Sequence, residues 1–159
     1  MDSHPTVEML RQERAKRKFP LLSARSGLLA ALIAIFVGLA FFAYNFQFVI
    51  VSGESMLPAL LPDQKILVCK ALWAVGMPSR GDIVVIDTED GFIVKRVAYL
   101  PGDEVDEDNR PFEWPLVPRF RVPENTIYVL GDNVHASEDS RSFGPVRIDR
   151  IIGKAVGAP

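Results

Sequence analysis

The sequence has few of the residues that build metal sites and covalent cross-links. Its 159 residues include one cysteine, Cys69, and two histidines, of which only His135 follows the first fifty residues. A single cysteine cannot form an internal disulfide, so the fold must be stabilised by packing. One histidine and one cysteine are too few for zinc ligation of the usual His/Cys kind. We therefore expect no metal and no organic cofactor.

Charge is absent from one long stretch. No Asp, Glu, Lys or Arg lies between Arg25 and Glu54. The mostly apolar residues 27–51 would form a helix about 37 Å long, enough to cross a hydrocarbon core of about 30 Å. A cleavable signal peptide has a shorter apolar region, and a buried helix of this length normally shows a polar face. The sequence therefore predicts a transmembrane helix over 27–51.

The remaining charge is divided unevenly. The net charge of −2 does not favour nucleic-acid binding. Residues 1–26 contain six Lys/Arg and three Asp/Glu, so this segment is basic and the rest of the chain is acidic. Basic flanks stay on the cytoplasmic side of a membrane. We therefore predict a cytoplasmic tail over 1–26, a single pass through the cell membrane, and an extracytoplasmic domain over 52–159.

Short strands dominate the region after the apolar stretch. Segments rich in Val, Ile and Tyr alternate with Gly, Pro and Asp clusters, and no helical period of useful length follows residue 60. The predicted strands are Lys65–Lys70, Ile83–Asp87, Phe92–Leu100, Thr126–Gly131 and Ile151–Val156. The expected fold class is mainly β, an antiparallel, barrel-like domain after one transmembrane helix. Prolines and acidic residues predict an extended, irregular stretch at about 104–121.

A serine in a tight turn follows the apolar stretch. The segment SGESMLPAL, residues 52–60, places Ser55 between Gly53 and Pro58. A serine nucleophile needs a group to accept its proton and donors for the oxyanion. The sequence GESM lacks the second glycine of a G-x-S-x-G elbow, so it does not indicate an α/β-hydrolase serine.

Two bases could serve Ser55. His135 with Asp132 or Asp139 would form a Ser/His/Asp set, whereas Lys95 would form a Ser/Lys pair. In FIVKRVAYL, strand alternation places Lys95 on the same face as two aliphatic residues, Ile93 and Val97. A free lysine has a pKa of about 10.4, and lowering that pKa to about 7.4 requires the charge to be disfavoured by about 4 kcal/mol, within reach of burial.

Four segments, taken together, resemble the bacterial type I signal peptidases, also called leader peptidases. They are SGESMLPAL, RGDIVVI, VKRVAYLPGD and GDNVHASEDSRSFG, and their order and spacing match from the apolar stretch to about Gly153. The resemblance implies a membrane-bound serine endopeptidase that cleaves signal peptides from exported preproteins after small residues at −1 and −3. It also implies that Ser55 is the nucleophile and that Lys95 is the general base.

The same resemblance implies that the stretch at about 104–121 is a short insertion, and it implies roles around the Ser55 and Lys95 pair. Ser137 would hydrogen-bond the Lys95 amine, Asp139 and Arg141 would form an ion pair that braces their loop, and Asp132 would support it further. The oxyanion would be bound by the Ser55 backbone N–H in the region of Gly53, a position where some family members have a serine. Pockets for small substrate residues would be lined by Val49, Val51, Leu60 and Val94.

The expected partners are preprotein signal peptides and the lipid bilayer. Candidates for shallow insertion into lipid are Met56, Leu57, Leu72, Trp73 and Met77. Three alternatives remain open: a catalytically silent membrane-tethered β domain that binds exported peptides, a maturation peptidase for one specialised substrate, and a Ser/His/Asp enzyme that uses His135. The sequence carries no signal for an oligomeric state.

Overall fold

The computed structural model describes residues 24–111 and 119–157. Most of the expected cytoplasmic tail and the centre of the expected insertion lie outside these ranges. The chain divides into two compact units, residues 1–41 and residues 42–159. The segment Ser26–Asn45 contains an 18-residue stretch with a mean hydropathy of 2.5, and by length and composition it could cross a membrane.

Helix α2 (Ala24–Asn45) ends earlier than the sequence predicts. The expected helix over 27–51 is wrong at its C-terminal end, because Phe46–Ile50 forms strand β1. These aromatic and β-branched residues pair antiparallel with β2, from Phe46 opposite Cys69 to Ile50 opposite Lys65. At the helix end, the buried Asn45 accepts a hydrogen bond through its carbonyl from Lys70 N at 2.7 Å. The apolar run is therefore shared between a helix and the first strand of the sheet.

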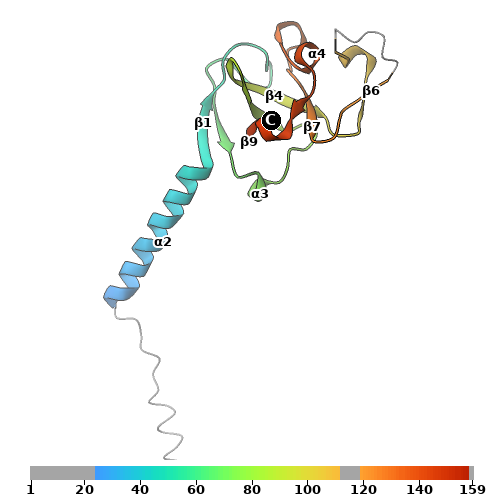
Figure 1. Cartoon of the computed structure of the whole chain (residues 1–159). Coiled ribbons are helices and arrows are strands. Elements are labelled where there is room, and N and C mark those ends of the chain that lie inside the picture. Colours follow the sequence, from blue (N-terminus) through green and yellow to red (C-terminus); the bar gives the residue numbers. More distant parts are fainter. Residues whose placement is uncertain (1–23, 112–118, 158–159) are drawn as a thin grey trace, which may run out of the picture. The chain divides into compact units, whose positions relative to one another are not determined.

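Seven strands form one antiparallel sheet (Figure 1). They are β1 (Phe46–Ile50), β2 (Lys65–Cys69), β3 (Ile83–Thr88), β4 (Gly91–Tyr99), β7 (Thr126–Leu130), β8 (Val146–Arg147) and β9 (Ile151–Val156). Their order is β1-β2-β9-β3-β4-β7-β8, and among the described residues β1 and β8 do not pair to close a barrel. The five predicted strands and the mainly β, antiparallel fold class are confirmed.

The remaining elements are short. Strands β5 (Glu104–Val105) and β6 (Phe120–Arg121) form a separate two-stranded sheet within the expected insertion. After α2, the described helices have three or four residues each, as the sequence predicts. They are α3 (Leu72–Val75), η1 (Glu107–Asn109), η2 (Val134–Ala136), α4 (Ser140–Phe143) and η3 (Ile148–Arg150).

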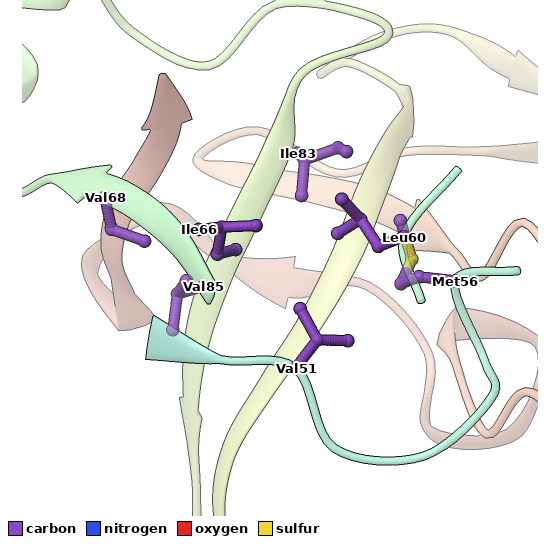
Figure 2. Close-up of a cluster of buried hydrophobic side chains, with 7 residues drawn as sticks. All are labelled: Val51, Met56, Leu60, Ile66, Val68, Ile83 and Val85. Atoms are coloured by element: carbon purple, nitrogen blue, oxygen red, sulfur yellow. The ribbon is translucent and has the colours of Figure 1, made fainter. Parts of the chain in front are cut away.

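The central strand β3 separates two hydrophobic clusters. Its residues alternate between them, so that Ile83 and Val85 face one cluster while Val84 and Ile86 face the other. The first cluster is drawn in Figure 2 and contains Val51, Met56, Leu60, Ile66, Val68, Ile83 and Val85. The second contains Val84, Ile86, Val97, Ile127, Val129, Val146 and Ile151. Burial on both faces is typical of a central strand with a near-continuous aliphatic sequence.

One residue expected at the lipid surface belongs to this core. The side chain of Met56 is fully buried among Val51, Leu60 and the β3 residues, so the expectation of lipid insertion is wrong for it. Trp73 and Met77, by contrast, are 78% and 56% exposed. Burial of Met56 removes the side chain next to Ser55 from water and thereby anchors the turn.

Candidate active site

Ser55 lies in an irregular segment between β1 and β2. The turn begins at Gly53, whose φ of 78° is in the region that favours glycine. It is closed by a hydrogen bond from Leu57 N to Glu54 O at 3.1 Å and is followed by one from Leu60 N to Met56 O at 2.9 Å. The backbone N–H of Ser55 donates no hydrogen bond to another described residue. The turn is thus fixed on its C-terminal side while the Ser55 N–H stays available.

Lys95 lies in the middle of β4, opposite Val84 on β3. Only 4% of its surface is exposed, and its amine makes no hydrogen bond or ion pair with any residue that the structure describes. Burial lowers the pKa of Lys95 below its ordinary value, although Asp139 and Glu138 act in the opposite direction. An amine in these surroundings can be neutral at a pH where an exposed lysine is charged.

Asp139 is the centre of the loop after β7. Its buried carboxylate accepts hydrogen bonds from Ser137 Oγ at 2.7 Å and from Gly131 N at 2.9 Å. It also binds the Arg141 guanidinium at two positions, Nε at 2.9 Å and Nη2 at 2.7 Å. Burial alone raises the pKa of Asp139, but the hydrogen bonds from Arg141, Gly131 and Ser137 outweigh it, and the pKa lies below its ordinary value. Asp139 therefore stays ionised and holds the loop.

The contact expected between Ser137 and Lys95 is not made. The Ser137 hydroxyl donates to Asp139, and no hydrogen bond joins it to the Lys95 amine among the described residues. The Ser137 oxygen can still accept a hydrogen bond from another donor. The ion pair between Asp139 and Arg141 is present, with side-chain exposures of 0% and 6%.

The same loop contacts the chain around Ser55. A Cβ at Gly131 would lie 2.6 Å from the Ser55 carbonyl oxygen and would overlap the Ser137 side chain. The Ser55 carbonyl accepts a hydrogen bond from Asn133 N at 2.9 Å, and the Glu54 carbonyl accepts one from Asn133 Nδ2 at 3.1 Å. The absence of a side chain at residue 131 thus lets the two segments approach.

Arg96, next to Lys95 on β4, also binds the loop after β7. Its guanidinium donates to both carboxylate oxygens of Asp132, at 2.8 Å and 2.7 Å, and to Gly81 O at 2.8 Å. The hydrogen bonds that Arg96 donates to Asp132 are the main cause that raises the pKa of Arg96. Arg96 therefore links β4 to the loop that touches Ser55, and it cannot itself accept a proton.

Ser55 and Lys95 line one cavity of about 890 Å³. Of the residues expected at the site, Gly53, Val49 and Val94 line it as well. Val51 and Leu60 do not, because both are buried in the first core cluster, and the expectation that they form substrate pockets is corrected accordingly (Figure 2). Aliphatic and aromatic lining residues that the sequence analysis did not assign to the cavity are Ile50, Ile86, Phe92, Ile93, Ala136, Phe143 and Val146.

Two strand edges beside this cavity are open. β4 pairs with β7 only from Arg96 to Tyr99, so 91–95 lacks a described partner on that side. Val97 exchanges hydrogen bonds with Asp82 and Gly81 on the β3 side, so alternation turns the N–H and C=O of Val94 toward the open side. Among the described strands, β1 pairs with β2 alone. An extended peptide could therefore bind by adding a strand.

The structure does not favour a histidine base. His135 is exposed and does not line the cavity, and it has no hydrogen bond or ion pair with Asp132 or Asp139. Those two carboxylates bind Arg96 and Arg141 instead. Nor do the described residues include a group of three or more His, Cys, Asp and Glu that could hold a metal ion. Acyl transfer by a serine with a lysine base is the chemistry that the lining residues could perform.

Comparison with known proteins identifies relatives for most of the chain. Residues 24–113 and 107–158 match the family described as signal peptidase, peptidase S26. The chain is 34% identical over 143 residues to signal peptidase I of Bacillus caldolyticus, which covers 70% of this chain and 78% of that protein. It is 33% identical over 141 residues to mitochondrial ATP-independent inner membrane protease subunit 1b of Arabidopsis thaliana, covering 83% and 80%. A crystal structure of a signal peptidase I from Enterococcus faecalis matches with 26% identity and a TM-score of 0.39, over 50% of this chain and 97% of that one.

Proposed function

The chain belongs to the signal peptidase family S26 and is a serine peptidase, and on this premise we propose that Ser55 is its nucleophile and Lys95 its general base. The substrates are preproteins bearing signal peptides, cleaved after small residues at −1 and −3. The proposal is carried by one observation: Ser55 shares its cavity with a lysine that is buried, lacks a described partner and has a lowered pKa.

The reaction has two stages. Ser55 Oγ attacks the carbonyl carbon of the −1 residue while its proton passes to the neutral Lys95 amine. The C–N bond then breaks, Lys95 returns the proton to the leaving amine, and an ester links Ser55 to the signal peptide. A water molecule attacks that ester and gives a proton to Lys95. The ester C–O bond then breaks, Lys95 returns the proton to Ser55 Oγ, and the signal peptide leaves with a new carboxyl group.

Two groups are available to bind the reacting carbonyl and the substrate backbone. The Ser55 N–H, next to Gly53, is the donor proposed for the oxyanion. The open edges of β1 and of residues 91–95 in β4 can hold the substrate as an added strand. Val49 and Val94 line the cavity, and in this proposal they face alternate substrate residues and select small side chains.

Ser137 and Asp139 are proposed to support the base. The Ser137 oxygen can accept a hydrogen bond from the Lys95 amine while its own proton remains on Asp139. Asp139 is fixed by Arg141, and Asp132 by Arg96, so both carboxylates are restrained before substrate arrives. Such restraint lowers the reorganisation needed when charge develops on Lys95.

The topology is also part of the proposal. The segment Ser26–Asn45 spans the cell membrane once, with residues 1–26 in the cytoplasm and the domain from residue 52 onward outside. The basic tail sets this orientation. In this topology Ser55 lies ten residues along the chain after Asn45, the end of the membrane helix. The serine is therefore on the side of the membrane where preproteins emerge.

Cleavage of a preprotein with an A-x-A site tests the assignment. Full-length chain in detergent should cleave it, and Ser55→Ala and Lys95→Ala should each reduce kcat by at least about a thousandfold. Three matched changes should retain activity: Ser52→Ala in the same cavity, Lys65→Ala on an exposed strand position, and His135→Ala. Retained activity in Ser55→Ala or Lys95→Ala would refute the roles, whereas loss in His135→Ala would favour the histidine base.

A further inference from the structure

Asn133 makes two contacts with the segment that carries the serine. Its backbone N–H donates to Ser55 O at 2.9 Å, and its side-chain amide donates to Glu54 O at 3.1 Å. The preceding residue, Asp132, is bound at both carboxylate oxygens by Arg96 of β4. Asn133 therefore joins the nucleophile's turn to the strand that carries Lys95.

The contact with Glu54 O fixes the direction of a neighbouring donor. The Glu54 C=O and the Ser55 N–H belong to the same planar, trans peptide unit, so they point in opposite directions. When Asn133 holds the oxygen on the side of the loop, the N–H must point away from that loop. The Ser55 N–H has no acceptor among the described residues, and Gly53, Glu54 and Ser55 all line the cavity.

We propose that Asn133 is a positioning residue that aims the Ser55 N–H at the oxyanion. This inference rests on the proposed function, because the oxyanion forms only if Ser55 attacks a carbonyl. The hydrogen bond to Glu54 O also polarises the shared peptide unit and makes its N–H a stronger donor. The negative charge develops in the transition state, so loss of this orientation should lower kcat and leave KM nearly unchanged.

The experiment compares Asn133→Ala with Asn109→Ala in the full chain. Alanine at 133 keeps the backbone bond to Ser55 and removes only the side-chain donor. The Asn109 side chain also donates one amide hydrogen bond, to Tyr99 at 3.0 Å, but it does not line the cavity. The two variants thus lose similar bonds inside and outside the site.

For Asn133→Ala we expect kcat on an A-x-A preprotein to fall about tenfold, less than when an oxyanion donor itself is removed, with KM within about twofold. Affinity for a peptide boronate, which forms a tetrahedral adduct with serine, should fall in parallel with kcat/KM. The pH midpoint of kcat/KM should not move, because Lys95 is untouched. Asn133→Ser, too short to reach Glu54 O but suited to a loop, should behave like the alanine variant.

Several results would overturn the role of Asn133 while the wild type still cleaves: unchanged kcat, a rise in KM alone, a shifted pH midpoint, or an equal loss in Asn109→Ala. A wild-type chain that cleaves no A-x-A preprotein would overturn the proposed function and this inference together. The two failures are therefore distinguishable.

Discussion

Lys95 and Ser55 reach the same cavity by different physical means. Lys95 belongs to the nine-residue strand β4, and its pairing with Val84 determines which face it occupies. Ser55 lies in a turn between β1 and β2 and is not part of a helix or a strand. Its position depends on the buried Met56 behind it and on Gly131 and Asn133 from a distant loop. The base is placed by register, whereas the nucleophile is placed by contacts across the fold.

This difference separates two kinds of sensitivity. Register along β4 is set by six consecutive residue pairs with β3, so a change at one residue is absorbed by the rest. The turn at Ser55 has no such ladder, and the loop after β7 holds it by two hydrogen bonds from Asn133. Changes in the loop after β7 should therefore affect the nucleophile more than the base.

The largest effect is expected for Asp139→Asn. Asp139 and Arg141 are almost fully buried, so removing the carboxylate charge leaves an uncompensated guanidinium, at a cost of about 3–5 kcal/mol in unfolding free energy. The matched change Asp132→Asn breaks the more exposed pair with Arg96 and should cost about 1 kcal/mol. Urea unfolding of the two variants measures the difference. Equal losses would show that burial does not distinguish these pairs.

A smaller effect on stability, but a direct one on the nucleophile, is expected for Gly131→Ala. The added Cβ would meet the Ser55 carbonyl at 2.6 Å and should displace the serine, lowering kcat by about a hundredfold. Overpacking should also cost about 1–3 kcal/mol.

Gly153→Ala is the control for Gly131→Ala. Its Cβ would meet the Cys69 carbonyl at 2.5 Å, an equally crowded site outside the cavity lining. It should destabilise the fold by a similar amount but leave the kcat of the folded enzyme unchanged. Preprotein cleavage and urea unfolding separate the two outcomes. A similar loss of kcat in both variants would attribute the effect to destabilisation rather than to the position of Ser55.

The sequence predicts the base's surroundings better than the nucleophile's. Strand alternation placed Lys95 with Ile93 and Val97, and β4 begins and ends within one residue of the predicted strand. These patterns are local and periodic, so they can be read without the fold. The end of α2 could not be predicted from the sequence, because the apolar segment Phe46–Ile50 is compatible with either a helix or a strand. Its pairing with β2 decides between the two.

Contacts between distant segments escaped prediction for the same reason. Asn133 and Glu54 are 79 residues apart, and nothing in either segment indicates their hydrogen bond. Val51 and Leu60 flank the serine in sequence, yet their side chains point into the core rather than the cavity. Two-residue strands such as β8 are too short to show alternation. Proximity in sequence thus indicates the site but not which side chains face it.

The effect expected to be smallest at high pH is the gain in stability in Lys95→Met. Burial lowers the pKa of Lys95 in the folded chain, so between that pKa and about 10.4 the unfolded chain binds more protons, and wild-type stability rises with pH. Methionine carries no charge and removes this rise. The variant should therefore be more stable than wild type at low pH, by about 1.4 kcal/mol for each pH unit of depression, and the margin should vanish near pH 10.4.

Lys65→Met provides the reference for this measurement. Lys65 is exposed on β2, so its replacement removes a lysine without changing the buried core. Urea unfolding of wild type and both variants from pH 6 to pH 10 gives the three curves. A Lys95→Met curve parallel to wild type would mean that the buried amine keeps its ordinary proton affinity. A lysine with that affinity could not accept the serine proton near neutral pH, so the same curves test stability and chemistry together.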